Sequence, residues 1–232
     1  MTNKIAIITG GTKGIGFAIV RKFLLHKFTV YTCGSGSSVD KLEEINHHPY
    51  FYISKVDLKD KIAIKNWANE IIKKYKDISV LINNAGRFLP GSIEEEAEDT
   101  FEELMATNLG SAYHTTRAFL PALKENSEGH IFNICSTASI TAYVNGGSYC
   151  ISKFGLLGLS KVLREELKPF GIKVTSIIPG ATYTDSWAST DLPEERFMKA
   201  DDIADMIWAA YSLSPCSVVE EILMRPLLGD IS

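Results

Sequence analysis

The feature that most constrains the fold is a regular alternation of short apolar runs with longer amphipathic segments along the whole chain. The apolar runs have the length of buried strands, and the amphipathic segments have the length of helices that cover a sheet. Repeated strand-helix-strand units predict a doubly wound parallel sheet with helices on both faces. The seven predicted strands are Lys4–Thr9, Phe28–Cys33, Tyr50–Ser54, Val80–Ile82, His130–Cys135, Lys173–Ile178 and Glu221–Met224.

Length and charge narrow the class of protein. A chain of 232 residues, 45% of them hydrophobic, can bury one large core, so we expect a single α/β domain over residues 1–232. The formal net charge of -4 offers no basic field for nucleic acid and favours a small-molecule partner. No apolar run approaches the roughly 20 residues of a membrane span, and the N-terminus does not read as a signal peptide. We expect a soluble cytoplasmic protein with no membrane or nucleic-acid partner.

The cysteines and histidines give no sign of a disulfide or a metal site. The sequence has no C-x-x-C pair, so we interpret all four cysteines as reduced thiols packed in the interior. They are Cys33, Cys135, Cys150 and Cys216. The adjacent pair His47 and His48 has no accompanying cluster of cysteines or carboxylates, and no metal site is predicted.

A glycine-rich turn follows the first predicted strand. Thr9-Gly10 leads through Gly11, Thr12, Lys13, Gly14, Ile15 and Gly16 into an apolar helix. Glycines between a strand and a helix let the backbone approach a pyrophosphate, whose charge then lies at the helix N-terminus. An ordinary tight turn is the alternative, because the G-x-x-x-G-x-G spacing differs from the common dinucleotide fingerprint.

The residues after the second strand indicate which dinucleotide is preferred. NAD sites usually place an acidic residue about 20 positions beyond the glycines, and here the first acidic residue is Asp40. The small loop around Ser35 leaves room for a 2′-phosphate, and Lys13 supplies a cation. We therefore favour NADP(H) and keep NAD(H) possible. The alternative is a solvated Lys13 beside a flexible Ser-Gly loop.

Polar residues also end the third and fourth predicted strands. Asp57 could contact an adenine edge or cap the following helix. Asn84, Ala85 and Gly86 leave the fourth strand, which would border the ligand crevice of a doubly wound sheet. The segment could let a ligand ring approach closely, or it could be an ordinary turn.

Two further positions point to the same crevice. Asn108 stands inside a helix predicted from about Phe101 to Lys124, where asparagine is intrinsically unfavourable, which suggests a partner deeper in the fold. Ser136 follows the fifth predicted strand and brings a hydroxyl to the carboxyl rim of the sheet. Loop hydrogen bonding is the alternative for this serine.

Tyr149 and Lys153 lie four residues apart in a segment that reads as helix, so their side chains share one face. A lysine beside a phenol stabilises the phenolate and lowers its pKa, which suits a tyrosine for proton transfer near neutral pH. A solvent-facing lysine is the alternative for an isolated pair. Upstream, the acidic run Glu94–Asp99 precedes the helix of Asn108 and is interpreted as a solvated face.

Together these residues resemble the classical short-chain dehydrogenases/reductases over nearly the whole chain. The motifs are T-G-x-x-x-G-x-G at Thr9–Gly16, N-N-A-G at Asn83–Gly86, the helical Asn108, Ser136, Y-x-x-x-K at Tyr149–Lys153 and the pair Pro179-Gly180. The resemblance implies a Rossmann-type fold and an NAD(P)-dependent oxidoreductase that acts on a ketone or an alcohol.

The resemblance also implies roles for individual residues. Tyr149 would be the general acid/base, Ser136 would polarise the carbonyl oxygen, and Lys153 would lower the Tyr149 pKa and hold the nicotinamide ribose. Asn108 would position a relay water. The cofactor would be held by the glycine turn with Thr12, Lys13 and Ile15, by Ser35, Asp57, Asn84, Ala85 and Gly86, and by Pro179, Gly180, Thr182 and Thr184 near the nicotinamide.

Three expectations concern substrate, assembly and class. Phe88, Tyr183 and Trp187 could wall the substrate site, or the last two could pack a lid down. The helix of Tyr149 carries more apolar residues than one face needs, which favours a homodimer or homotetramer, and an ordinary buried helix is the alternative. These residues are Phe154, Leu156, Leu157, Leu159, Val162 and Leu163. The alternative to an enzyme is a catalytically silent dinucleotide-binding sensor or scaffold, although such a protein would be expected to lose Tyr149 or Lys153 first.

Overall fold

A computed structural model describes residues 4–34, 42, 45, 47–125, 128–187 and 190–231. Seven strands form one sheet in the order β3-β2-β1-β4-β5-β6-β7, and every neighbouring pair is parallel. The strands are β1 Ile5–Thr9, β2 Thr29–Gly34, β3 Phe51–Lys55, β4 Val80–Asn83, β5 His130–Ile134, β6 Lys173–Pro179 and β7 Glu221–Met224. The predicted sheet is confirmed, and no strand end differs from its predicted position by more than one residue.

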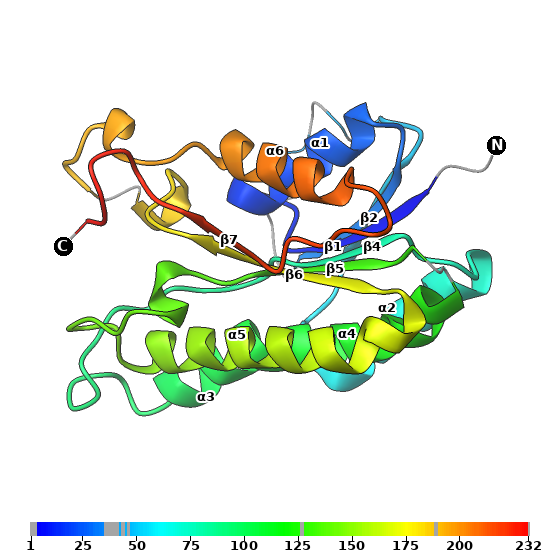
Figure 1. Cartoon of the computed structure of the whole chain (residues 1–232). Helices are drawn as coiled ribbons and strands as arrows, with labels where there is room; N and C mark the ends of the chain where they lie inside the picture. The colour runs from blue at the N-terminus through cyan, green and yellow to red at the C-terminus, as the bar shows by residue number, and fades with distance from the viewer. Residues whose placement is uncertain are drawn as a thin grey trace.

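The order of the strands reverses between β1 and β4. The chain leaves β1 for β2 and β3 on one side and then returns to β4 on the other side of β1. Ile8 pairs with Ile82 in register, so the turns that follow β1 and β4 leave the sheet side by side. Ligands of doubly wound sheets bind at such a switch point, outside the carboxyl ends of the strands. These ends lie on the left in Figure 1.

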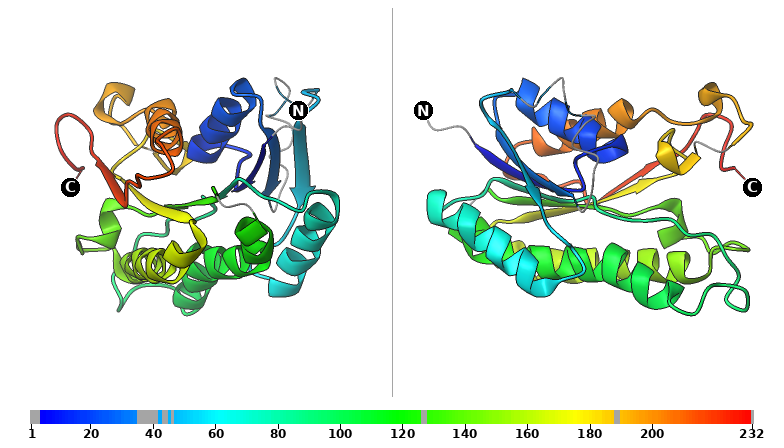
Figure 2. Two further views of the ribbon diagram at one scale, coloured as in Figure 1. Left: turned by 45° about the vertical axis from the view of Figure 1, so that its right-hand side comes forward. Right: turned by 180° about the vertical axis from the view of Figure 1, so that it is seen from behind.

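Helices cover both faces of the sheet, as Figures 1 and 2 show. The helices α1 (Gly14–Leu25) and α6 (Ala200–Tyr211) lie on one face, and α2 (Lys61–Lys74), α4 (Ser111–Glu125) and α5 (Gly147–Leu167) lie on the other. Successive side chains of a strand point to opposite faces. Ile8 accordingly packs in the core beneath α1 and α6, whereas Ile7 packs in the core beneath α2, α4 and α5. All five residues of β1 are buried, which fixes the first turn on a rigid strand.

The helix predicted from Phe101 to Lys124 is not continuous. It consists of α3 (Thr100–Leu104), a π-helical segment Met105–Gly110 and then α4. The N–H of Ser111 donates to the carbonyl of Ala106, five residues back. A π-helical turn carries an extra residue and is frequent at functional sites. It contains Asn108, whose side chain is completely buried.

Residues of α5 divide between the core and the surface. Leu156, Leu157 and Leu163 are buried, whereas Phe154 and Val162 are 45% and 53% exposed. The prediction that this helix carries more apolar surface than one face buries is therefore confirmed for these two residues.

Three of the four cysteines are buried as expected, but Cys216 is exposed, so its predicted interior position is wrong. It lies in the polar segment between α6 and β7, where no sheet or helix covers it. In the described parts of the chain, no helix combines the length and the apolar character needed to cross a membrane.

Candidate active site

The glycine turn has the geometry of an anion cradle. Gly10 has a φ of +67°, which favours glycine, and its N–H donates to the carbonyl of Cys33. A Cβ on Gly16 would lie 2.3 Å from the carbonyl oxygen of Gly10, so the helix can approach the turn only with glycine there. Lys13 is the N-cap of α1 without a side-chain capping bond, and the first turn holds no acidic residue. The first N–H groups of α1 can therefore bind a phosphate, while Ile15 packs against the core.

The turn after β4 is tied to the glycine turn. Thr9 Oγ1 accepts hydrogen bonds from the backbone N–H groups of Asn84 and Ala85, at 3.0 and 3.1 Å. Asn84 Nδ2 donates to the carbonyls of Thr9 and Gly10, at 2.9 and 3.0 Å. The side-chain amide of Asn84 thus holds the two turns together at the switch point.

The first asparagine of the N-N-A-G motif, Asn83, joins β4 to α4 and to β5. Asn83 is buried, and its Nδ2 donates to Thr116 Oγ1 and to Asn133 Oδ1, both at 2.8 Å. Gly86, at the other end of the motif, lies close to Asn108 and Lys153. A Cβ there would lie 3.3 Å from Asn108 Oδ1 and 3.5 Å from Lys153 Nζ.

Lys13 and Thr12 lie at the mouth of the cradle. Lys13 Nζ forms an ion pair at 3.2 Å with Asp185, and both side chains are more than half exposed. Thr12 is nearly buried beside Gly34, the last residue of β2. The predicted cation of the turn is therefore accessible and has an acidic neighbour that the sequence did not reveal. Ser35 lies outside the described residues.

Asp57 follows β3 and forms a local turn. Its Oδ1 accepts from the backbone N–H of Lys59 at 2.9 Å, and the residue is exposed. The interpretation of Asp57 as a helix cap is wrong, because the N-cap of α2 is Asp60, whose carboxylate accepts from the N–H of Ile62. The contact of Asp57 with an adenine stays a prediction.

Ser136 is fixed at the carboxyl end of β5 by a capping box. Its Oγ accepts from the N–H of Ala138, and its own N–H donates to Ser139 Oγ, both at 3.1 Å. A serine hydroxyl can accept and donate at the same time, so Ser136 can still donate its proton while it accepts from Ala138. Burial raises the pKa of Tyr149, and a side-chain hydrogen bond with Ser136 acts in the opposite direction.

Tyr149 and Lys153 converge on Ser136 from α5. Lys153 is buried, and its Nζ donates to the carbonyl of Ile134 at 2.8 Å and lies 5.9 Å from the centroid of the Tyr149 ring. Burial lowers the pKa of Lys153 to about 8. Burial also raises the pKa of the Tyr149 phenol, against the hydrogen bond with Ser136. This differs from the expected lowered pKa, because desolvation of the phenolate outweighs its polar neighbours.

Asn108 anchors this cluster from the π-helical segment. Its Oδ1 accepts from the N–H of Arg87 at 2.7 Å, and its Nδ2 donates to the carbonyl of Arg87 and to Ser152 Oγ. Ser152 Oγ in turn donates to the carbonyl of Tyr149 at 2.7 Å. The side chain of Asn108 is thus occupied in joining the β4 exit to α5. Sequence reasoning missed Ser152, although a serine one position before Lys153 in a buried helix was an available signal.

The segment after β6 closes the other side of the site. Pro179 ends β6, and the N–H of Gly180 donates to the carbonyl of Met224. Thr182 is buried, and its hydroxyl donates to the carbonyl of Gly180 at 3.1 Å. Thr184 contacts the glycine turn, because a Cβ on Gly14 would lie 3.1 Å from its methyl group. The segment thus reaches from β6 to the pyrophosphate cradle.

The three aromatic residues predicted near the substrate have different positions. The Phe88 ring meets the Tyr149 ring edge to face, with centroids 4.9 Å apart. Tyr183 and Trp187 both pack on Phe197, at 5.7 and 5.1 Å. The alternative that aromatic residues pack the lid down therefore describes these two, and Phe88 lies beside the Tyr149 phenol.

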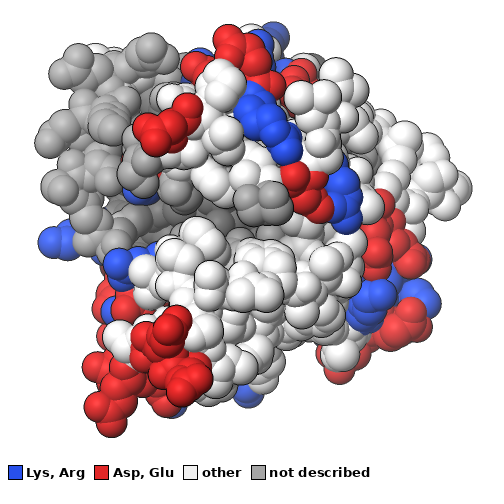
Figure 3. Space-filling view, turned by 90° about the vertical axis from the view of Figure 1, so that its left-hand side faces the viewer, with Lys and Arg blue, Asp and Glu red and all other residues white. Residues whose placement is uncertain are grey.

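Charged groups are unevenly spread over the surface around the site. Figure 3 looks onto the carboxyl ends of the strands, where uncharged groups fill the middle of the described surface, acidic and basic groups cross its upper part, and further charged groups lie at the lower left and the right. The described residues contain no group of three or more histidine, cysteine or acidic side chains placed to hold a metal ion.

The family follows from comparison with known proteins. A family model described as short chain dehydrogenase matches residues 4–195 of this chain. The chain belongs to the short-chain dehydrogenase/reductase family. It is therefore an oxidoreductase that acts on CH–OH or C=O groups.

Individual relatives of this short-chain dehydrogenase span nearly the same length. Sepiapterin reductase of Chlorobaculum tepidum is 32% identical over 238 residues, which cover 98% of each chain. A 3alpha-hydroxysteroid dehydrogenase of Mediterraneibacter gnavus is 32% identical over 199 residues, covering 84% of this chain and 79% of the relative. The structure of an alcohol dehydrogenase from Thermococcus sibiricus, complexed with 5-hydroxy-NADP, superposes with a TM-score of 0.89 at 26% identity over 100% of both chains.

Proposed function

We propose that this short-chain dehydrogenase is an NADP(H)-dependent reductase of a small ketone or aldehyde, which can also run in the direction of alcohol oxidation. The Tyr149 hydroxyl gives its proton to the carbonyl oxygen, and the Ser136 hydroxyl donates a hydrogen bond to the same oxygen. A nicotinamide bound beside them supplies the hydride. Lys153, whose Nζ lies 5.9 Å from the centroid of the Tyr149 ring, would hold the nicotinamide ribose.

The observation that carries this proposal is the convergence of Ser136, Tyr149 and Lys153 at the carboxyl end of β5. The three groups come from two different elements, and backbone contacts hold Ser136 in its capping box and Lys153 on the carbonyl of Ile134. Such pre-organised donors act where charge develops in the transition state. The Asn108–Ser152 contact supports the same arrangement by fixing the carbonyl of Tyr149.

The preference for NADP(H) rests on Lys13, which is exposed at the mouth of the glycine turn. The relative from Thermococcus sibiricus was solved with an NADP derivative. In the proposed complex, the first turn of α1 binds the pyrophosphate, Asp57 lies toward the adenine, and Pro179, Gly180, Thr182 and Thr184 lie toward the nicotinamide. Homodimer or homotetramer formation through α5 is proposed from the exposed Phe154 and Val162.

A panel of small ketones, aldehydes, diketones and quinones tests the proposal. Loss of NADPH absorbance is followed for the wild-type protein, for Tyr149→Phe and for Ser136→Ala. We expect turnover that falls by roughly a thousandfold or more in Tyr149→Phe, within the range for loss of a general acid. Binding of NADPH should persist in both variants. Turnover that survives in Tyr149→Phe would contradict the proposed role of the phenol.

A further inference from the structure

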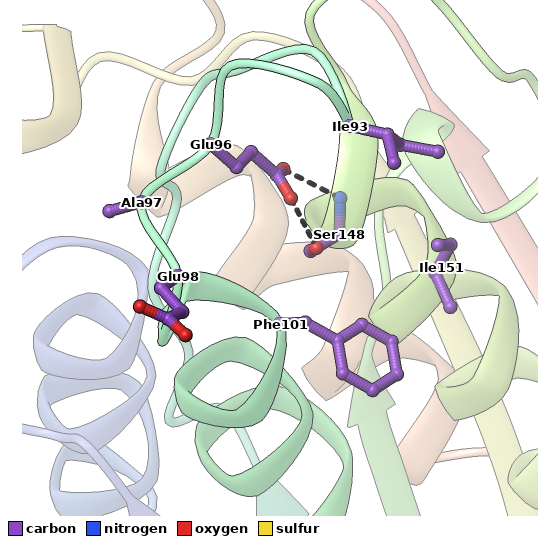
Figure 4. A pocket seen from close by; sticks show the side chains of 7 residues that line it. All are labelled: Ile93, Glu96, Ala97, Glu98, Phe101, Ser148 and Ile151. Atoms are coloured by element: carbon purple, nitrogen blue, oxygen red, sulfur yellow. Dashed lines mark hydrogen bonds between the residues drawn. The ribbon is translucent and has the colours of Figure 1, made fainter.

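The carboxylate of Glu96 caps the start of α5, the helix that carries Tyr149. One oxygen, Oε1, accepts from the backbone N–H of Ser148 at 2.8 Å, and the other, Oε2, accepts a short hydrogen bond from the Ser148 hydroxyl. Figure 4 shows both bonds side by side. The N-cap residue, Gly146, has no side chain of its own to offer. The cap of α5 is therefore supplied by a loop that lies 52 positions earlier in the chain.

The backbone around this contact is built for close approach. Gly91 and Gly146 form a parallel bridge, and the N–H of Gly91 donates to the carbonyl of Asn145 at 2.9 Å. A Cβ on Gly147 would lie only 2.2 Å from Glu96 Oε1. Glu96 thus occupies a slot between the loop and the helix that a side chain at position 147 would fill.

The loop of Glu96 contacts the catalytic helix at two adjacent points. Ser148, which receives the carboxylate, is nearly buried and directly precedes Tyr149. Phe88, at the start of the same loop, packs against the Tyr149 ring. The loop therefore holds both the backbone before Tyr149 and the ring itself.

We propose that Glu96 is a positioning residue for Tyr149: by capping the first turn of α5, its carboxylate fixes the orientation of the phenol toward Ser136. The proposal rests on the proposed catalytic role of Tyr149. From the sequence, we interpret the acidic run Glu94–Asp99 as a solvated face that precedes the helix of Asn108. For Glu96 this interpretation is wrong, because its carboxylate binds the N-terminus of α5 instead.

Loss of the contact between Glu96 and Ser148 should lower the reaction rate strongly, for physical reasons. Hydrogen bonds to an ionised acceptor are roughly twice as strong as neutral ones, and a carboxylate is further stabilised by the positive end of the helix dipole. Tyr149 is the third residue of α5, inside the turn that frays when a cap is lost. A misplacement of about 1 Å at a reacting group can cost on the order of a hundredfold in rate.

The test compares Glu96→Ala and Glu96→Gln with the control Glu98→Ala. Glu98 lies in the same loop, and together with Glu96 and Ser148 it lines a pocket of about 260 Å³, which Figure 4 shows. Unlike Glu96, Glu98 is exposed. We expect Glu96→Ala to lower kcat by about tenfold or more while the Kd of NADPH changes by less than about twofold. Glu96→Gln should have a kcat between those of Glu96→Ala and the wild type, because its amide oxygen can still accept from the Ser148 N–H but the side chain no longer carries a charge. Glu98→Ala should resemble the wild type.

Three results would overturn the proposal. They are a kcat of Glu96→Ala within about twofold of the wild type, a parallel loss of NADPH affinity that indicates general unfolding, and equal losses in the Ala and Gln variants.

A second readout does not depend on a substrate. In protein labelled with ¹³C at the tyrosine ζ carbon, the Tyr149 signal is assigned by its disappearance in Tyr149→Phe. It should shift or broaden in Glu96→Ala and stay in place in Glu98→Ala, and an unmoved signal in Glu96→Ala would refute the proposal. Wild-type protein that turns over no carbonyl compound would instead count against the proposed reductase, so the two failures are distinguishable.

Discussion

Replacement of Lys13 by alanine tests how this protein distinguishes NADPH from NADH. Lys13 lies at the N-terminus of α1, next to the glycine turn, and its ammonium group is accessible. If the ammonium binds the 2′-phosphate of the cofactor, the substitution should weaken NADPH binding and leave NADH binding almost unchanged.

The expected size of the effect follows from the exposure of Lys13. A unit charge about 4 Å from another contributes about 1 kcal/mol in bulk water, and a 2′-phosphate carries up to about two charges. The side chain is 57% exposed, which places the effective dielectric near that of water. Binding of the 2′-phosphate would break the exposed ion pair of Lys13 with Asp185, which offsets about 0 to 1 kcal/mol of the attraction between Lys13 and the phosphate. We therefore expect a loss of about 1 to 2 kcal/mol, or roughly 5- to 30-fold in the Kd of NADPH.

The assay is direct titration of wild-type and Lys13→Ala protein with NADPH and NADH, followed by nicotinamide fluorescence at two salt concentrations. The difference between the variants should shrink at high salt, because exposed charges are screened. An unchanged Kd for NADPH, or an equal loss for both cofactors, would refute the assignment of Lys13 to the 2′-phosphate.

Three further predictions concern the cofactor cradle, a buried histidine and the exposed surface of α5. Asp185→Asn should tighten NADPH binding by about two- to fivefold without affecting NADH, because Lys13 loses a competing partner, and the same titration measures it. Burial lowers the pKa of His130 to about 3, whereas an unfolded histidine titrates near 6.5, so the unfolded chain binds a proton that the folded protein excludes. The free energy of unfolding of the wild type should therefore fall by roughly 2 to 3 kcal/mol between pH 7.5 and 4.5, relative to that of His130→Phe. Urea unfolding at each pH measures both proteins, and free energies of unfolding that change in parallel with pH would contradict the prediction. Val162→Glu should shift the molecular mass measured by light scattering to a smaller species, since it places a charge on the proposed α5 interface; an unchanged mass would exclude that interface.

The sheet could be predicted from the sequence because both signals, the short apolar runs and the amphipathic segments between them, are local. The isoleucines and valines of β1 and β4 are buried on both faces, and such strands read as continuous apolar runs. The glycine turn and the spacing of Tyr149 and Lys153 were also visible, since each depends on neighbouring residues in the chain. The structure places them at one rim of one sheet, which is where the alternation of elements predicts them.

Features that depend on distant partners were not visible in the sequence. The π-helical turn at Asn108 was not predicted, whereas the partner expected for its side chain is confirmed by its bonds to Arg87 and Ser152 on two other segments. The ion pair of Lys13 with Asp185 joins positions that only the fold brings together. Burial of Tyr149 likewise depends on packing, so the sign of its pKa shift could not be inferred from the nearby lysine alone.

Transfer of deuterium from labelled cofactor to product would test the central claim most directly. NADPH that carries deuterium at the transferable position is incubated with the protein and with each carbonyl compound of the panel, and the alcohols are analysed by mass spectrometry. The account predicts an alcohol that carries one deuterium on the former carbonyl carbon with wild-type protein and none above background with Tyr149→Phe. Tight NADPH binding with no labelled alcohol from any compound, or equal labelling by Tyr149→Phe, would contradict it.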